Sequence, residues 1–459
     1  MKRSLFLFLF IFNVSLISSQ TIYTAVGFFP GPHGYTGDGG PATSARLDYP
    51  SDLKFDKTGN LYIAEFTNNI IRKVNTSGII TTIAGNGYMA GTGNGGFSGD
   101  GGPATAAELW GPTGIACDTF GNIYIADVNN NIIRKVNTSG TINTIVGNFS
   151  YLPGYSGDGG QATNAEVNGP YWVATDISGN VYFTDVGNNV IRKVDTSGII
   201  EPFAGNYSYG GGYSGDGGPS TAAELSVPEA IAFSPSGNLY IADGANQVIR
   251  MVNSSGTIST IAGNGIYGYS GDGGQATAAE FSPYGIAFDV SGSLYISDAD
   301  ADVIRKIDNS GIITTVAGYG WHLGYSGDGG LATLAKMNLN NGITLDVSGN
   351  LFIADQGNNV VRVVKNISTS IKQPIASNNI SVYPNPSNGS FTLEYGLPTT
   401  ESGKIVLYNE FGEKVGEYQL DAGKNKMNIT NNNLSNGIYF YQVFVNNKGS
   451  KRGKLIITK

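Results

Sequence analysis

The chain has 459 residues, of which 67 are glycine and only 14% are charged, and its formal net charge is −8. This length is enough for one large domain and a smaller one, each with a buried core. The many glycine, tyrosine and phenylalanine residues are typical of an all-β protein, and the single cysteine excludes an internal disulfide.

The sequence opens with the pattern of an export signal. Lys2 and Arg3 precede an apolar run over 5–16, and the residues ISSQ that follow suit cleavage near Ser19. The run is shorter than the roughly 20 apolar residues that a membrane-spanning helix needs. Residues 1–19 are therefore predicted to be a signal peptide, and the mature chain is expected to be exported without a transmembrane segment.

Six copies of one unit fill residues 20–366. The motif GDGG places an aspartate at Asp38, Asp100, Asp158, Asp216, Asp272 and Asp328. The motif LYIAD, or a close variant, ends at Glu65, Asp127, Asp185, Asp243, Asp298 and Asp355. An arginine follows each of these after seven residues, at Arg72, Arg134, Arg192, Arg250, Arg305 and Arg362.

Each copy is predicted to contain four strands. In one copy the first strand is GIAFD at 285–289, where apolar side chains alternate with small ones. Turns containing SGN, GNN and TSG separate it from strands of the types LYIAD, VIRKV and IITTIAG. The alanine-rich segment after each GDGG is compatible with one helical turn. Antiparallel four-stranded units repeated six times predict a β-propeller.

The sixth copy lacks its fourth strand, because ISTSIKQPIASNN follows its third. The stretch TIYTAVGFF at 21–29 matches the fourth strand TINTIVGNF at 141–149. An open ring would leave strand edges with unpaired backbone groups. Residues 21–26 are therefore expected to pair with 360–364 and close the propeller.

Composition changes after residue 366. Residues 367–379 are predicted to be a linker, and 380–459 contain short strand patterns between polar turns, which indicates a small β-sandwich. Residues 20–366 hold 15 basic and 29 acidic residues, a net charge of −14, whereas 380–459 hold 9 and 6, a net charge of +3.

Two family resemblances rest on these motifs. The pattern P-x-G-I-A-x-D-x-x-G-N-x-Y-I-A-D-x-x-N-x-x-I-R-K resembles the NHL repeat, and SGDGGPATxAxL resembles its variant in bacterial surface proteins and teneurin-type propellers. The segments VYPNPSNGSFTLEY, VLYNEFGEKV, LSNGIYFYQV and KLIITK resemble the C-terminal sorting domain of the type IX secretion system. The first resemblance implies a six-bladed propeller without fixing its function. The second implies export through that machinery, with release or surface attachment as outcomes.

The repeated charged residues favour structural roles. Six similar Asp–Arg pairs resemble a ring of carboxylates, but a catalytic site usually departs from the repeat, so we expect ion pairing within the fold. The GDGG aspartates are expected to stabilise their turns rather than bind calcium, which needs about 6–8 converging oxygen ligands. The aromatics that precede them are expected to seal the blades, with sugar stacking as the alternative; they are Tyr35, Phe97, Tyr155, Tyr213, Tyr269 and Tyr325.

Histidine and cysteine are scarce. His33 and His322 lie in loops that neighbour one another in a closed ring, so a shared metal is conceivable, but two histidines without a third ligand are weak evidence for zinc. The metal-dependent lyases of this fold use more histidines. Cys117 lies in an apolar run and is predicted to be a core residue. The sequence thus predicts no metal and no cofactor.

The connections that enter each GDGG vary most between copies. Variation in repeat proteins gathers on one face, often the binding face. The ligand-binding candidates are Tyr88, Met89, Tyr151, Tyr207, Tyr209, Tyr267, Trp321 and His322, with loops that bind nothing as the alternative. The dispersed basic residues argue against nucleic-acid binding. The sequence favours an exported module that binds protein or glycan over its alternative, a metal-dependent lyase or hydrolase.

Overall fold

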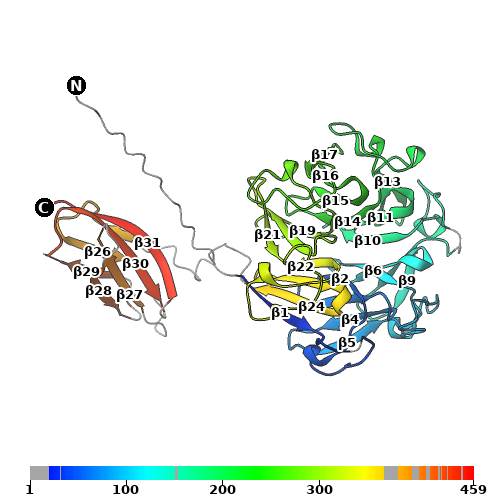
Figure 1. Ribbon diagram of the computed structural model, residues 1–459, viewed down its shortest axis with the longest axis horizontal. Coiled ribbons are helices and arrows are strands. Elements are labelled where there is room, and N and C mark those ends of the chain that lie inside the picture. The colour runs from blue at the N-terminus through cyan, green and yellow to red at the C-terminus, as the bar shows by residue number, and fades with distance from the viewer. Residues whose placement is uncertain are drawn as a thin grey trace. The chain divides into compact units, whose positions relative to one another are not determined.

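The computed structural model describes residues 20–31, 33–149, 153–365, 381–394, 403–409, 414–421, 424, 426–431, 433–445 and 448–459. The chain divides into two compact units, Met1–Ile367 and Ser368–Lys459 (Figure 1). The predicted signal peptide at 1–19 and the predicted linker at 367–379 lie outside the described residues. Each unit is considered by itself below.

The first unit consists of six antiparallel sheets of four strands. We number these blades in chain order. Blade 1 consists of β2(Pro50–Phe55), β3(Leu61–Glu65), β4(Ile70–Val74) and β5(Ile80–Ala84). Blade 2 consists of β6(Pro112–Cys117), β7(Ile123–Asp127), β8(Ile132–Val136) and β9(Ile142–Val146). Blade 3 consists of β10(Pro170–Thr175), β11(Val181–Asp185), β12(Val190–Val194) and β13(Ile200–Ala204). Blade 4 consists of β14(Pro228–Phe233), β15(Leu239–Asp243), β16(Val248–Val252) and β17(Ile258–Ala262). Blade 5 consists of β18(Pro283–Phe288), β19(Leu294–Asp298), β20(Val303–Ile307) and β21(Ile313–Ala317).

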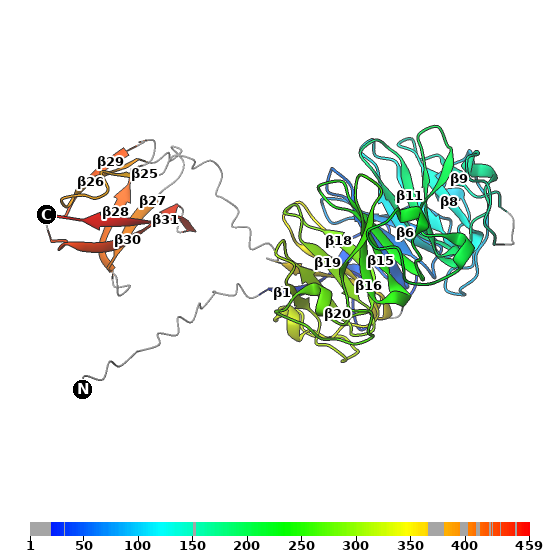
Figure 2. The ribbon, with the colours of Figure 1, turned by 90° about the horizontal axis from the view of Figure 1, so that it is seen from above.

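The first strands of the blades surround a common axis. Each contacts the first strands of the two neighbouring blades, which closes a ring. In Figure 1 β2, β6, β10, β14 and β22 lie centrally and β5, β9, β13 and β17 lie toward the outside; Figure 2 shows the same blades turned by 90°. This arrangement confirms the predicted propeller.

Blade 6 joins the two ends of the propeller sequence. Its strands are β22(Asn340–Leu345), β23(Leu351–Asp355), β24(Val360–Lys365) and β1(Thr21–Val26), in the spatial order β1-β24-β23-β22. Strand β1 runs antiparallel to β24, with Thr21 opposite Lys365 and Val26 opposite Val361. The predicted closure by the N-terminal strand is therefore confirmed.

The core lies between neighbouring blades. One cluster combines Ala64 and Ile71 of blade 1 with Ile115 and Ile125 of blade 2, all buried. The alanine-rich turns contribute to these clusters and form single 3-10 turns, as predicted: η1(Ala42–Ser44), η2(Ala104–Ala106), η4(Ala162–Asn164), η7(Ser220–Ala222), η9(Ala276–Ala278) and η10(Ala332–Leu334). Further 3-10 turns are η3(Val128–Asn130), η5(Val186–Asn188), η6(Tyr207–Tyr209), η8(Gly244–Asn246) and η11(Gln356–Asn358).

The second unit is the predicted β-sandwich. One sheet contains β25(Ser381–Tyr383), β26(Ser390–Glu394) and β29(Lys426–Thr430). The other has the order β28(Lys414–Leu420), β27(Gly403–Tyr408), β30(Gly437–Val445), β31(Lys448–Ile457). Phe391 and Leu393 from the first sheet pack with Ile405 and Val443 from the second, so the two sheets share one core.

Candidate functional site

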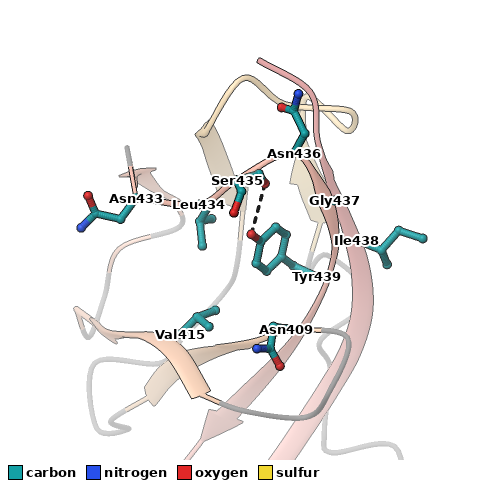
Figure 3. A pocket seen from close by; sticks show the side chains of 9 residues that line it. All are labelled: Asn409, Val415, Asn433, Leu434, Ser435, Asn436, Gly437, Ile438 and Tyr439. Atoms are coloured by element: carbon teal, nitrogen blue, oxygen red, sulfur yellow. Dashed lines mark hydrogen bonds between the residues drawn. The ribbon is translucent and has the colours of Figure 1, made fainter.

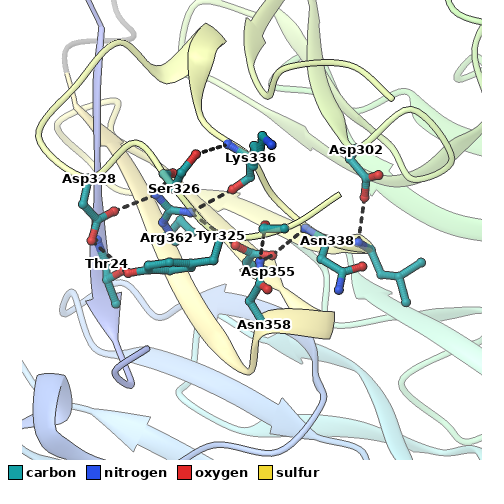
Figure 4. A network of polar contacts seen from close by, with 12 residues as sticks. Thr24, Asp302, Tyr325, Ser326, Asp328, Lys336, Asn338, Asp355, Asn358 and Arg362 are labelled. Carbon is teal, nitrogen blue, oxygen red and sulfur yellow. Dashed lines mark hydrogen bonds and ion pairs between the residues drawn. The ribbon is translucent and has the colours of Figure 1, made fainter. Parts of the chain in front are cut away.

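Each blade contains a fully buried arginine that contacts two carboxylates. In blade 6 Arg362 Nη2 lies 2.6 Å from Asp328 Oδ1, and Nη1 lies 3.3 Å from Asp355 Oδ2 (Figure 4). The corresponding Nη2–Oδ1 distances in blades 1 to 5 are 2.5, 2.6, 2.5, 2.7 and 2.8 Å. The carboxylates of the LYIAD-type motif are themselves fully buried, as Asp355 illustrates. A ring of such carboxylates is closed to a substrate.

The structure gives the GDGG aspartates a partner that the sequence analysis did not assign. We expected these carboxylates to stabilise their own turns. In blade 2, Asp100 instead pairs with Arg134, and its Oδ2 accepts a hydrogen bond from the backbone N–H of Thr144 on β9 at 3.1 Å. The GDGG segment also pairs with the start of the same outer strand, since Gly101 N donates to Ile142 O at 2.9 Å. The motif therefore covers the free edge of its blade.

The repeated aromatics lie over these arginines. The guanidinium carbon is 4.7–5.5 Å from the ring centroid in all six blades, for example 4.7 Å in the pair Arg192 and Tyr155. In three blades a second ring, from the loop after the fourth strand, stacks on the first: Phe149 on Phe97, Tyr207 on Tyr155 and Phe29 on Tyr325, at 3.8, 4.1 and 4.3 Å. The candidate Tyr207 thus packs against its own blade.

The remaining ligand candidates lie on the variable loops. Tyr88 and Met89 are exposed, Tyr209 is 67% exposed, and Tyr151 lies outside the described residues. Tyr267 and Trp321, which are 56% and 50% exposed, belong to consecutive loops and lie together with ring centroids 6.2 Å apart. The His322 ring contacts Tyr319 in a tilted arrangement with centroids 4.3 Å apart, and its Nδ1 lies 2.6 Å from Gly320 O.

The loop that carries Trp321 is held in place by its backbone. Trp321 N donates to Ala301 O at 2.9 Å. The backbone of Trp321 has a φ of 64°, a conformation that residues other than glycine rarely adopt. Local desolvation, followed by the charges of Asp300 and Asp298, raises the pKa of Tyr267. An exposed ring pair with a nearby carboxylate therefore connects the loop that enters blade 5 with the loop that leaves it.

The other chemistry-bearing candidates have local partners. His33 Nδ1 lies 3.2 Å from Asp48 Oδ2, so the two histidines contact different groups. Within the described part of the chain, no group of three or more His, Cys, Asp or Glu is arranged to hold a metal ion. Burial raises the pKa of Cys117 to about 12, which keeps the thiol protonated near neutral pH.

The sequence analysis missed a set of residues at the propeller axis. The second residue of each first strand is Ser51, Thr113, Tyr171, Glu229, Tyr284 or Asn341. The Thr113 hydroxyl donates to Tyr171 O at 2.7 Å, across to the next blade. The hydroxyls of Tyr171 and Tyr284 share a hydrogen bond of 2.5 Å although they come from blades 3 and 5. A signal was present in the sequence, because this position carries Ser, Thr, Tyr, Glu or Asn whereas the fourth position of the same strand is Leu, Ile or Val in every blade.

The second unit contains a pocket of about 480 Å³ between Asn409, Val415 and residues 433–439. Figure 3 shows Tyr439 beside Leu434 and Val415, with its hydroxyl donating to Ser435 O at 3.1 Å. Three asparagines, Asn409, Asn433 and Asn436, also line it. The segment LSNGIY that forms one wall is one on which the resemblance to a sorting domain rests.

Family comparisons match both units. The teneurin NHL domain matches residues 18–94, 83–154, 152–211, 209–268 and 266–324. The secretion system C-terminal sorting domain matches residues 381–458. This sorting domain indicates export to the cell surface or the surrounding medium. In the described part of the chain, no helix has the length and apolar character needed to cross a bilayer.

Similar proteins include animal teneurins and bacterial propellers. Teneurin-1 of Gallus gallus is 26% identical over 88% of this chain, and teneurin-3 of Mus musculus is 30% identical over 47%. The chain spans only 15% and 8% of the lengths of these two proteins.

A structural genomics protein of unknown function from Bacteroides thetaiotaomicron has a TM-score of 0.55 at 17% identity, over 75% of this chain and 76% of its own. An auxiliary nutrient binding protein from Bacteroides ovatus has a TM-score of 0.54 at 16% identity, with the same coverages. Both likenesses concern the fold alone. The five matched repeats and the six blades show that this chain belongs to the NHL-repeat family described by the teneurin NHL domain, here joined to a secretion system C-terminal sorting domain.

Proposed function

We propose that this protein is an exported binding module whose propeller holds a glycan or protein ligand outside the cell. The observation that carries the proposal is the Tyr267–Trp321 pair, two large exposed rings held together on consecutive loops. Exposed aromatic side chains on glycine-containing loops are typical of recognition surfaces, because they offer large contact areas and lose little conformational entropy.

The chemistry of this surface favours a glycan. Flat aromatic faces accept the C–H face of a sugar ring, and a carboxylate accepts hydrogen bonds from sugar hydroxyls. Asp300 lies close enough to raise the pKa of Tyr267. Exposed Ile266 and Leu323 flank the ring pair in sequence and extend its apolar character. A protein ligand with a protruding apolar side chain would use the same rings.

The alternative from the sequence is a metal-dependent lyase or hydrolase. It gains no support from the described residues, where the repeated carboxylates are buried against arginines and no metal-ligand cluster is present. The partner implied by the second unit is the type IX secretion machinery, acting on residues 380–459. The final location, released or attached to the cell surface, belongs to the same proposal.

Glycan-array binding followed by tryptophan fluorescence would test this proposal. Trp321 is half exposed whereas Trp172 is buried, so a ligand on the ring pair should change the emission of Trp321. Trp321→Ala and Tyr267→Ala should each weaken binding about tenfold or more. Phe120→Ala is the matched control, since Phe120 is exposed on a turn between first and second strands. Equal binding by all variants would contradict the choice of surface.

A further inference from the structure

One carboxylate at the propeller axis stands without a polar partner in the described part of the chain. Glu229 is the only acidic residue among the six second positions of the first strands. It is partly buried on β14 and has no hydrogen bond or ion pair among the described residues. Burial raises the pKa of its carboxyl to about 7. By contrast, Asp52, one position further along β2, accepts hydrogen bonds from Leu53 N and Ile115 N at 2.7 and 2.8 Å.

Space beside Glu229 depends on a glycine. Gly244 begins the turn after β15, and a Cβ atom there would lie 2.8 Å from Glu229 Cγ. The corresponding turns in blades 1, 2 and 3 begin with Phe66, Val128 and Val186. Gly244 therefore leaves room for the side chain of Glu229 in blade 4.

The groups around Glu229 include two tyrosines and an asparagine. Tyr171 and Tyr284 come from the blades on either side, with ring centroids 5.9 Å apart and planes at 86°. Burial is the main cause that raises the pKa of both phenols, and the charge of Glu229 adds to it in each case. Asn341 donates a hydrogen bond to Tyr171, while its Oδ1 is buried and has no hydrogen-bond partner among the described residues. Tyr49 directly precedes β2, and its side chain is exposed at the end of the axis where the first strands begin.

The turns closest to the starts of the first strands carry no basic residue. Turns between second and third strands lie beside the starts of the first strands, as the pairing of Pro228 with Asp243 shows. These turns, at 66–69, 128–131, 186–189, 244–247, 299–302 and 356–359, contain no lysine or arginine. One of them adds Asp300 and Asp302. These turns thus add negative charge and no positive charge near Glu229, which favours a cation there.

We propose that Glu229, Tyr171, Tyr284 and Asn341 form an axial site that binds a primary ammonium group, supplied by a lysine side chain or by a free amine. A primary ammonium carries one positive charge and three N–H donors. The carboxylate supplies the counter-charge, the amide oxygen of Asn341 accepts a second hydrogen bond, and the tyrosine faces favour a cation beside them. An anion would be repelled by the ionised carboxylate, and a neutral alcohol would leave the charge of that carboxylate uncompensated.

Calorimetric titration of the full mature chain at pH 8, where Glu229 is ionised, would test the site. The probes are n-butylamine and Nα-acetyl-lysine methylamide, with n-butanol as the uncharged control. We expect both amines to bind and the alcohol not to bind. Glu229→Gln should weaken amine binding about tenfold or more, because the charged partner is lost. Glu201→Gln, a change of an exposed acid on β13, should leave binding unchanged.

The affinities of the two amines distinguish a protein lysine from a free amine as the source of the ammonium group. Tighter binding of the lysine derivative would assign the site to a protein lysine, and tighter binding of butylamine would assign it to a free amine. Trp321→Ala should not alter either titration, so the axial site and the Tyr267–Trp321 surface can fail independently. No heat and no chemical-shift change in the tyrosine resonances at millimolar amine, or equal binding by the wild type and Glu229→Gln, would overturn the proposal.

Discussion

Thr24 on β1 lies opposite Arg362 on β24, across the strand pair that closes the ring. Thr82, Thr144, Thr260 and Thr315 occupy the same position opposite the arginines of blades 1, 2, 4 and 5. Thr24 N donates to Asp328 Oδ2 at 3.1 Å, and its hydroxyl lies 2.6 Å from that of Tyr325. The N-terminal strand is therefore joined to blade 6 by side chains as well as by its backbone (Figure 4).

Removing buried contacts of β1 should weaken the propeller. Ile22 is fully buried in a core cluster with Ile353 and Val364. Ile22→Ala should lower the free energy of unfolding by about 2–5 kcal/mol, measured by urea denaturation. The three tryptophans all lie in the propeller, so their fluorescence reports on this unit. Tyr23→Ala, next in sequence and partly exposed, should cost about 1 kcal/mol or less. Equal effects would contradict the role of Ile22.

Complete loss of the closing strand should have a larger effect. A chain lacking residues 20–29 should unfold at a lower temperature and over a broader range, because blade 6 would then expose the edge of β24. Differential scanning calorimetry would measure both changes. An unchanged transition of the propeller would mean that β1 does not close the ring.

A buried arginine should be costly to remove. Arg134→Met leaves Asp127 fully buried without its cation, and we expect a loss of about 3–5 kcal/mol in unfolding free energy. Adding Asp127→Asn should recover part of that loss, because the uncompensated charge disappears. Lys135→Met, at the neighbouring partly buried position, is the control and should cost less than about 1 kcal/mol. A double variant no more stable than Arg134→Met would contradict this account.

Substitutions of two tyrosines in one loop should affect stability differently, because Tyr207 packs on its blade and Tyr209 is exposed. Tyr207→Ala removes the ring stacked 4.1 Å from Tyr155 and should lower stability by about 0.5–1.5 kcal/mol. Tyr209→Ala should change stability by less than about 0.5 kcal/mol, because this side chain is mostly exposed. Thermal melts of both variants provide the measurement, and a reversed order would show that Tyr209 also packs on the blade.

Glu229 should make stability depend on pH. Burial raises the pKa of Glu229 from 4.5 to about 7 in the folded chain. Below pH 4.5 both states hold the proton; between pH 4.5 and 7 the unfolded chain loses it first, so stability falls as pH rises. Glu229→Gln should therefore match the wild type near pH 4 and exceed it by about 1–3 kcal/mol at pH 8. A difference that does not change between these pH values would exclude this titration.

The strands and their closure could be predicted because both follow from local patterns that recur in register. Arg134 and Asp127 are seven residues apart on adjacent strands, so their pairing was accessible to sequence analysis. Asp100 lies 34 residues before Arg134, and only the folding of the connection over the outer strand brings them together. The contact of Tyr267 with Trp321 likewise depends on the spacing of neighbouring blades. The axial residues were overlooked because the sequence analysis followed the positions that recur in every copy, and the second position of the first strand is not one of them.

The pairing of Thr21 with Lys365 places the entry and exit of the propeller chain at one point. This point lies at the opposite end of the blade from Gly27, where the first variable loop begins. If the protein is attached through residues that follow Lys365, the attachment is therefore at the end of blade 6 where Thr21 and Lys365 pair. Tyr267 and Trp321 lie on loops that follow fourth strands, at the other end of the blades from this point.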